Sequence, residues 1–92
     1  MKILKTSVIE DEHLMIINFE CVFDHSYDYS FQCTHKQIFA DLENKLHKKF
    51  PDLKDFNIYY LYSGGKITKY YETLEELGIK DREKILFDKI ED

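Results

Sequence analysis

The sequence predicts an α+β domain in which a sheet packs on one α-helix. Two consecutive segments alternate apolar and polar residues with a period of two, and the next segment repeats apolar residues every three to four positions. Two later segments are short and rich in β-branched and aromatic residues, as strands require. A chain of 92 residues, 43% apolar and 34% charged, has room for one such domain with its own core.

Two strands joined in a hairpin are predicted near the start of the chain. Residues 14–23 are dense in β-branched and aromatic residues, and residues 27–33 alternate apolar and polar side chains. Each segment places its apolar residues on one face, because successive side chains of a strand point to opposite sides. The three polar residues between them, 24–26, predict a tight turn and therefore an antiparallel hairpin.

The length of this turn fixes an expected register. A three-residue turn places Phe19 opposite Phe31 and Cys21 opposite Tyr29. Cys21 then does not lie across from Cys33, so we expect no disulfide bond between them. Two free cysteines, together with an N-terminus that lacks the features of a signal peptide, favour an intracellular location in the cytoplasm or the nucleus.

An amphipathic helix follows the hairpin. Thr34 and Gln37 have the spacing of a capping box, which predicts that the helix begins directly after Thr34. Apolar residues then recur at three- and four-residue steps from Ile38 to Phe50 and form one stripe that faces a core. Because Pro51 disfavours the helical conformation in the residue before it, we expect the helix to end near Phe50.

The remaining elements are short. A strand is expected at residues 57–62, and the Ser-Gly-Gly-Lys segment 63–66 has the composition of a turn. Residues 66–71 are expected to form a short strand or an irregular return. A single helical turn capped by Thr73 and ended by Gly78 follows. The last strand is expected at residues 84–90.

The apolar faces of the strands and the helix stripe converge on one predicted core. Its expected members are Ile17, Phe19, Phe31, Ile38, Leu42, Leu46, Ile58, Tyr60, Leu74, Leu77, Ile79, Ile85 and Phe87.

The order of these elements, and above all the second half of the sequence, resembles ubiquitin and the ubiquitin-like domains. Residues 60–66 look like the segment in which the third strand leads into a glycine turn and a lysine. Residues 73–81 are similar to the pattern of Thr-Leu, a short turn and an isoleucine, after which Ile85 and Phe87 match two inward positions. The resemblance implies a β-grasp domain at residues 14–92, with a mixed sheet of four to five strands packed on one α-helix.

Residues 1–13 have no counterpart in that pattern. They are expected to form either an N-terminal arm or an extra strand around residues 3–9, and the sequence leaves both alternatives open. No apolar run approaches the length of a membrane span. The net charge of −5 disfavours nucleic-acid binding. We therefore expect neither a membrane nor a nucleic acid as partner.

The C-terminal sequence departs from that of conjugated ubiquitin-like proteins. Those modifiers need a tail that ends in Gly-Gly, whereas residues 89–92 here read Lys-Ile-Glu-Asp. The pair Gly64-Gly65 is internal and has the composition of a turn. In this form of the chain we expect neither conjugation nor sulfur carriage. The alternative is a ubiquitin-like modifier whose conjugation tail is missing from this chain.

The resemblance also implies a non-catalytic adaptor that binds partner proteins through the outward face of the third and last strands. In ubiquitin this face carries an apolar patch, and the matching positions here are Leu61 and Leu86, with Tyr59 beside them. Asp88 replaces the third member of the patch, and Lys66 adds to a polar rim of mixed charge. We expect these five residues to form an exposed protein-binding patch on a domain that is monomeric when free.

No pattern in the sequence indicates catalysis, a cofactor or a metal. Cys21, His25, Cys33 and His35 have the residue types of metal ligands, but their spacing matches no structural zinc motif. No nucleophile with an adjacent base and no pair of carboxylates can be placed at one site. We therefore expect a protein that is not an enzyme and holds no cofactor or metal.

Overall fold

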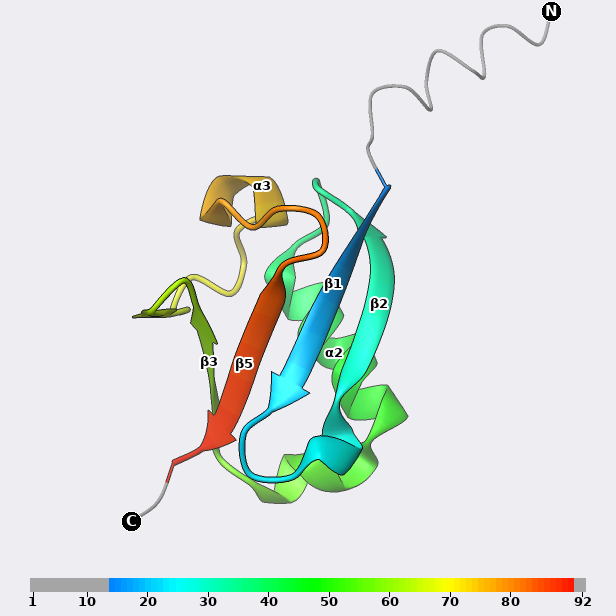
Figure 1. Ribbon diagram of the computed structural model, residues 1–92, viewed down its shortest axis with the longest axis vertical. Helices are drawn as coiled ribbons and strands as arrows, with labels where there is room; N and C mark the ends of the chain where they lie inside the picture. The colour runs from blue at the N-terminus through cyan, green and yellow to red at the C-terminus, as the bar shows by residue number, and fades with distance from the viewer. Residues whose placement is uncertain (1–13, 91–92) are drawn as a thin grey trace, which may run out of the picture.

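The computed structural model describes residues 14–90, so the expectation for residues 1–13 lies outside the described part of the chain. A twisted sheet forms one layer, and the longest helix lies across one of its faces (Figure 1). None of the helices in residues 14–90 is long and apolar enough to cross a membrane.

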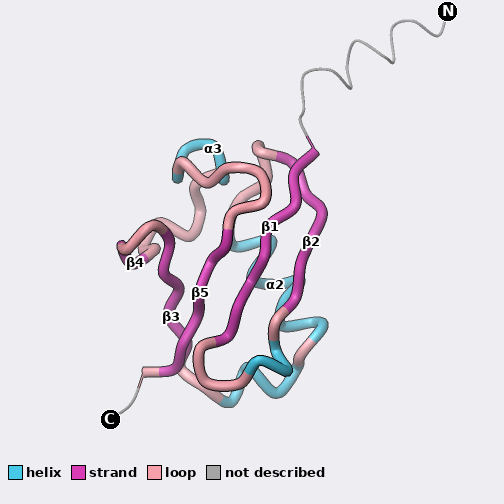
Figure 2. The backbone as a smooth tube through the Cα atoms, in the orientation of Figure 1, coloured by secondary structure: helices cyan, strands magenta, loops and turns pink. Residues whose placement is uncertain are grey.

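The elements follow the predicted order. They are β1 (Leu14–Cys21), the 3₁₀ helix η1 (His25–Tyr27), β2 (Tyr29–Thr34), α2 (Phe39–Lys49), the 3₁₀ helix η2 (Pro51–Asp55), β3 (Ile58–Tyr62), β4 (Gly65–Lys66), α3 (Leu74–Leu77) and β5 (Lys84–Lys89). The strands form one sheet in the order β2-β1-β5-β3-β4. The central strands β1 and β5 run parallel and the other neighbours antiparallel. Figure 2 shows the short β4 at the edge beside β3, which completes the mixed sheet expected from the sequence.

The hydrophobic core lies between the sheet and α2. Most of the predicted members are buried, and the remaining four, Phe31, Ile38, Ile58 and Leu77, are half-buried. The core also contains residues that the predicted list lacked, namely Met15, Cys21, Cys33, Phe39, Leu53 and Ile67. Both cysteines are free, as expected. Burial raises the pKa of both thiols, so they stay protonated at neutral pH.

The register of the β1–β2 hairpin differs from the predicted one by two residues. Phe19 lies opposite Tyr29, and Ile17 lies opposite Phe31, so the expected Phe19–Phe31 and Cys21–Tyr29 pairs are wrong. The predicted inward and outward faces of the two strands are still correct, because a shift of two residues preserves the alternation of side chains.

The error arises because the connection is longer than a tight turn. Residues 22–28 form a loop that contains η1, and the Asp24 carboxylate caps it by accepting the N–H of Ser26 at 3.0 Å. Asp28 Oδ1 accepts the N–H of Cys21 at 2.7 Å and so closes the loop at its base. Polar residues such as Asp24 and Asp28, whose type predicted a tight turn, instead stabilise a seven-residue loop through side-chain hydrogen bonds.

Asp28→Ala is expected to lower the free energy of unfolding by about 1–3 kcal/mol, because it leaves the Cys21 amide without its charged acceptor. Asp28→Asn keeps a side-chain carbonyl at this position and should lose less than half as much. Urea unfolding measures the loss, and amide hydrogen exchange at Cys21 reports the bond itself. A Cys21 amide that exchanges equally slowly in Asp28→Ala would contradict this assignment.

The helix α2 begins later than predicted. Thr34 is the last residue of β2, and the helix starts at Phe39 without a side-chain cap, so the expected capping box is wrong. The N–H groups of Phe39 and Ala40 instead bond to the carbonyls of Glu72 and Tyr70, at 3.0 and 2.8 Å. A distant segment therefore satisfies the helix N-terminus, and no local sequence pattern reports such a partner. The predicted end near Phe50 is confirmed.

The single-turn helix α3 begins and ends at the residues that the sequence predicted. Thr73 Oγ1 accepts the N–H of Glu76 at 3.0 Å, and Glu76 Oε1 accepts the N–H of Thr73 at 2.9 Å. Gly78 ends the turn in the left-handed conformation, with φ of +79°. The Tyr62 hydroxyl ties this end to β3 by donating to the Gly78 carbonyl at 2.9 Å and contacting the carboxylate of Glu83.

Candidate protein-binding face

The sheet face that points away from α2 carries the residues that alternate with the core. On β3, Tyr60 is fully buried, so its neighbours Tyr59 and Leu61 point to the other face. On β5, Phe87 is fully buried, so Leu86 and Asp88 point outward with them. The sequence therefore assigned the inward and outward positions of both strands correctly.

Strand pairing brings the five predicted site residues together. Leu61 lies directly opposite Leu86, and Tyr59 lies opposite Asp88 on the same pair of strands. Lys66 on β4 lies opposite Leu61 on its other side. We call these five residues, Tyr59, Leu61, Lys66, Leu86 and Asp88, the outer patch.

The apolar part of the outer patch is less exposed than expected. Tyr59, Leu61 and Leu86 are all half-buried, whereas the sequence had suggested a freely exposed cluster. Leu61 and Leu86 shield each other across the two strands. The Lys66 ammonium lies 5.2 Å from the centre of the Tyr59 ring and covers part of it. A shallow apolar surface remains, with the exposed side chain of Lys66 beside it.

Two further residues, one on β1 and one directly after it, extend this surface. Glu20 lies opposite Leu86 and forms an ion pair with Lys84, with 2.9 Å between Oε1 and Nζ. Val22 is 49% exposed, and its N–H donates to the carbonyl of Phe87 at 2.8 Å, which places it beside β5. Sequence reasoning missed both residues. The alternation along β1 marks Glu20 as outward, but only the parallel pairing of β1 with β5 brings it to the patch.

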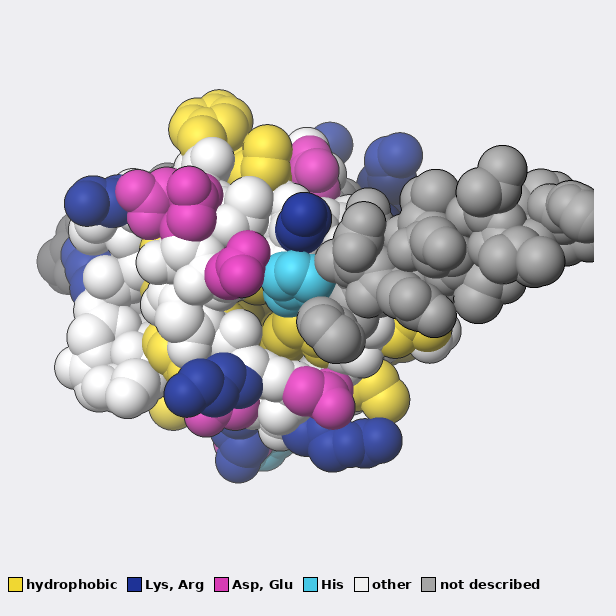
Figure 3. Space-filling view, turned by 90° about the horizontal axis from the view of Figure 1, so that it is seen from above, with side chains coloured by type: hydrophobic (Ala, Val, Ile, Leu, Met, Phe, Trp, Pro, Cys, Tyr) yellow, Lys and Arg dark blue, Asp and Glu magenta, His cyan; other side chains and the backbone are white. Residues whose placement is uncertain are grey.

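Acidic and basic side chains are both present on the surface of residues 14–90. Seen from the end that carries α3, acidic and basic side chains are interspersed, and hydrophobic side chains form small separate areas (Figure 3). The rim of the outer patch follows this distribution, with Glu20 and Asp88 near Lys66 and Lys84. Among residues 14–90, no group of three or more His, Cys, Asp and Glu side chains is placed to hold a metal ion.

The sequence matches no protein-family model and no curated protein. The structure is similar to the solution NMR structure of the ubiquitin-like domain of an Arabidopsis thaliana protein, with a TM-score of 0.68 over 82% of this chain and 76% of that one. The two sequences are 16% identical, so the likeness concerns the fold. The chain has the ubiquitin-like β-grasp fold that its sequence predicts.

Proposed function

We propose that this domain is a non-catalytic adaptor that binds a partner protein through the outer patch. The observation that carries the proposal is the direct pairing of Leu61 with Leu86 across β3 and β5. Both side chains lie on a sheet face on which no helix of residues 14–90 packs (Figure 1). Ubiquitin-like domains are generally not enzymes, and the structure is similar to one such domain.

The charge around the patch supports a protein partner. Acidic and basic side chains alternate at its rim, which sets the orientation and the on-rate of a partner more than its affinity. The binding energy then comes from the central apolar residues, as at other protein interfaces. The net charge of −5 and a single arginine argue against nucleic acid as the partner.

The proposal also covers the oligomeric state of the domain and its cellular location. A half-buried apolar surface of this kind can face water in a monomer, so we propose that the domain is monomeric when free. Buried cysteines that remain unpaired fit the reducing cytoplasm or nucleus. Neither membranes nor cofactors have a part in this function.

Leu61→Asp is expected to weaken partner binding by about 2 kcal/mol, which is about 30-fold in Kd. A carboxylate at this position faces Leu86 and must be desolvated when the partner binds. Affinity capture from native lysate, with wild-type and variant domains compared by quantitative mass spectrometry, identifies the partner. Titration of that purified partner then measures the change in Kd.

Leu14→Asp is the matched control. It makes the same substitution on β1 at a side chain that is 67% exposed and lies outside the patch. Because Leu61 is half-buried, urea unfolding must show that the Leu61→Asp domain is folded, and Lys66→Glu provides an exposed variant in the same patch. Equal capture of the partner by the wild type, Leu61→Asp and Lys66→Glu would reject the proposal.

A further inference from the structure

We propose that a second site, on the helix side of the sheet, binds an arginine side chain from a basic segment of a partner protein. A groove of about 700 Å³ lies there between α2 and the segment that follows β4. Six of the residues that line it, Asp41, Glu43, Asn44, Thr68, Tyr70 and Tyr71, define what we call the tyrosine groove. It is separate from the outer patch, because Tyr60 points to this side of β3 and Leu61 to the other.

The charge of the tyrosine groove is entirely acidic. Asp41 and Glu43 are its charged lining residues, and Lys69, between two lining residues in sequence, does not line it. Neither carboxylate has an ion pair within residues 14–90. Glu43 is half-buried, so its charge is only partly solvated. A cation supplied by a partner would offset the free-energy cost of partly burying the Glu43 carboxylate.

The buried hydroxyl group of Tyr60 lies behind the groove wall. Tyr60 is fully buried, and its ring centre lies 5.9 Å from that of Tyr70. Burial, followed by the carboxylate of Glu43, raises the pKa of Tyr60, so its hydroxyl stays protonated at neutral pH and leaves the negative charge on Glu43. Tyr60 is not among the lining residues, so a ligand in the groove meets the Glu43 carboxylate and not this hydroxyl.

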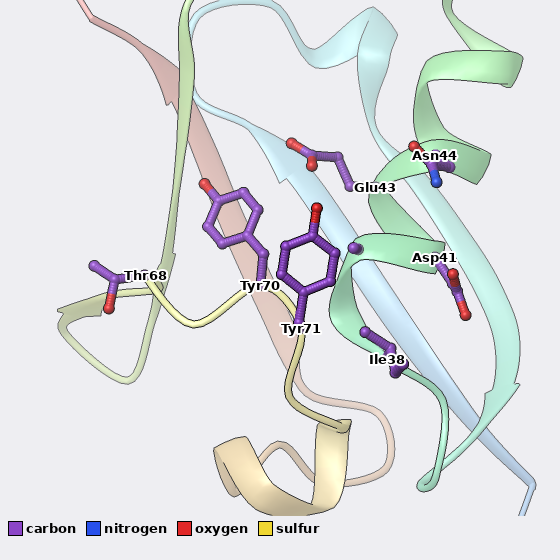
Figure 4. Close-up of a pocket in the computed structure, with 8 residues that line it drawn as sticks. Ile38, Asp41, Glu43, Asn44, Thr68, Tyr70 and Tyr71 are labelled. Atoms are coloured by element: carbon purple, nitrogen blue, oxygen red, sulfur yellow. The ribbon is translucent and has the colours of Figure 1, made fainter.

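The aromatic residues favour a planar cation. Tyr71 is 84% exposed, the highest value among the large apolar side chains of residues 14–90. In Figure 4 the carboxylate of Glu43 extends from α2 toward the side on which Tyr70 and Tyr71 lie, and the two tyrosine hydroxyls point in different directions. A guanidinium group can stack on a tyrosine face and donate in parallel to a carboxylate, which an ammonium group does less well. This combination selects arginine among the cationic side chains.

The helix N-terminus beside the groove does not favour an anion. The N–H groups of Phe39 and Ala40 are occupied by the carbonyls of Glu72 and Tyr70, and the N–H of Asp41 bonds to the carbonyl of Ile38. The backbone donors that would otherwise attract a phosphate or a carboxylate are thus largely used. With two carboxylates nearby, the groove complements positive charge.

Titration of the ¹⁵N-labelled full chain with a short peptide tests this site. The probe is Ac-Gly-Ser-Arg-Ser-Gly-NH₂, and the reference peptide carries citrulline, which has the shape of arginine without its charge. We expect saturable amide shifts at Ala40, Asn44 and Tyr71, and an affinity for the arginine peptide about fivefold higher or more. Equal affinity for the two peptides, or shifts confined to other residues, would overturn the proposal.

Variants assign the contributions of individual residues. Glu43→Gln should lower the affinity for the arginine peptide about fivefold, whereas Asp55→Asn removes an equal charge outside the groove and should change it less than twofold. Tyr71→Ala should lower it about threefold. If Glu43→Gln unfolds, the exposed Asp41→Asn takes its place.

Two comparisons decide the outcome. Equal effects of the groove variants and Asp55→Asn would show only a general attraction between an acidic protein and a cation, and would reject the site. Leu61→Asp should leave peptide binding unchanged, since it alters the opposite face of β3. A change in peptide affinity in a Leu61→Asp domain that urea unfolding shows to be folded would also reject the site.

Discussion

Phe19→Ala is expected to lower the free energy of unfolding by about 3–5 kcal/mol. Phe19 is 2% exposed and lies at the centre of an aromatic cluster. The ring centres of Phe31, Phe39, Tyr60 and Phe87, which come from four other elements, lie 5.8–6.2 Å from its own. Removing this ring leaves a cavity that rigid strands on several sides cannot fill, so both the burial energy and the contacts are lost.

Urea unfolding, followed by circular dichroism, measures this loss as a change in midpoint at constant slope. A loss of this size is a large part of the roughly 5–15 kcal/mol that stabilises a typical domain. Tyr71→Ala is the control, because it removes an aromatic ring that is 84% exposed. Phe19→Leu should lose less than Phe19→Ala, since it fills part of the cavity. Equal midpoints for Phe19→Ala and Tyr71→Ala would show that the core is centred elsewhere.

Side-chain alternation explains why the sequence predicted so much of the sheet. It placed Ile17 and Phe19 inward on β1, and the same rule placed Leu61 and Leu86 outward on β3 and β5. Alternation depends on neighbours in the chain alone, so it survives errors in strand length or register. Alternation gave the outward positions of the outer patch, and the resemblance to ubiquitin, in which the third and last strands are neighbours, brought them together.

Features that depend on distant residues could not be predicted in this way. The start of α2 at Phe39 is set by carbonyls of residues 70–72, and Thr34, which looked like its cap, pairs with Leu14 in the sheet. Leu53 and Ile67 are buried, yet Leu53 lies in the short 3₁₀ helix η2 and Ile67 directly after β4, and neither segment is long enough for a periodicity to mark them. The tyrosine groove could not be predicted either, because it forms between α2 and the segment after β4, which meet only in the folded chain.

Alkaline pH is expected to destabilise the domain strongly through its tyrosines. A hydrogen bond to Asp52 raises the pKa of Tyr27 to about 12, and burial together with Glu83 raises that of Tyr62 to about 12. Burial raises the pKa of Tyr60 as well. Each phenol ionises more readily in the unfolded chain, where its pKa is about 10. The stability they contribute is therefore complete below pH 10 and is lost as the pH rises from 10 through 12.

Urea midpoints measured from pH 8 to pH 11.5 test this expectation, with absorbance at 295 nm to follow tyrosine ionisation. The midpoint should be steady up to about pH 9.5 and should fall steeply above it. The wild-type curve sums the contributions of the three tyrosines and does not separate them. A curve that stays level to pH 11.5 would contradict the expectation.

Tyr60→Phe separates the contribution of Tyr60 from the others. At pH 7 it removes a fully buried hydroxyl beside the Glu43 carboxylate, and the stability of the variant at this pH is the baseline for the comparison. Above pH 10 the wild type must take up one proton at Tyr60 to fold, and the variant does not. Its stability should therefore fall less steeply, by about 1.4 kcal/mol per pH unit. Parallel curves for the two proteins would show that the Tyr60 hydroxyl ionises in the folded domain, against its burial beside Glu43.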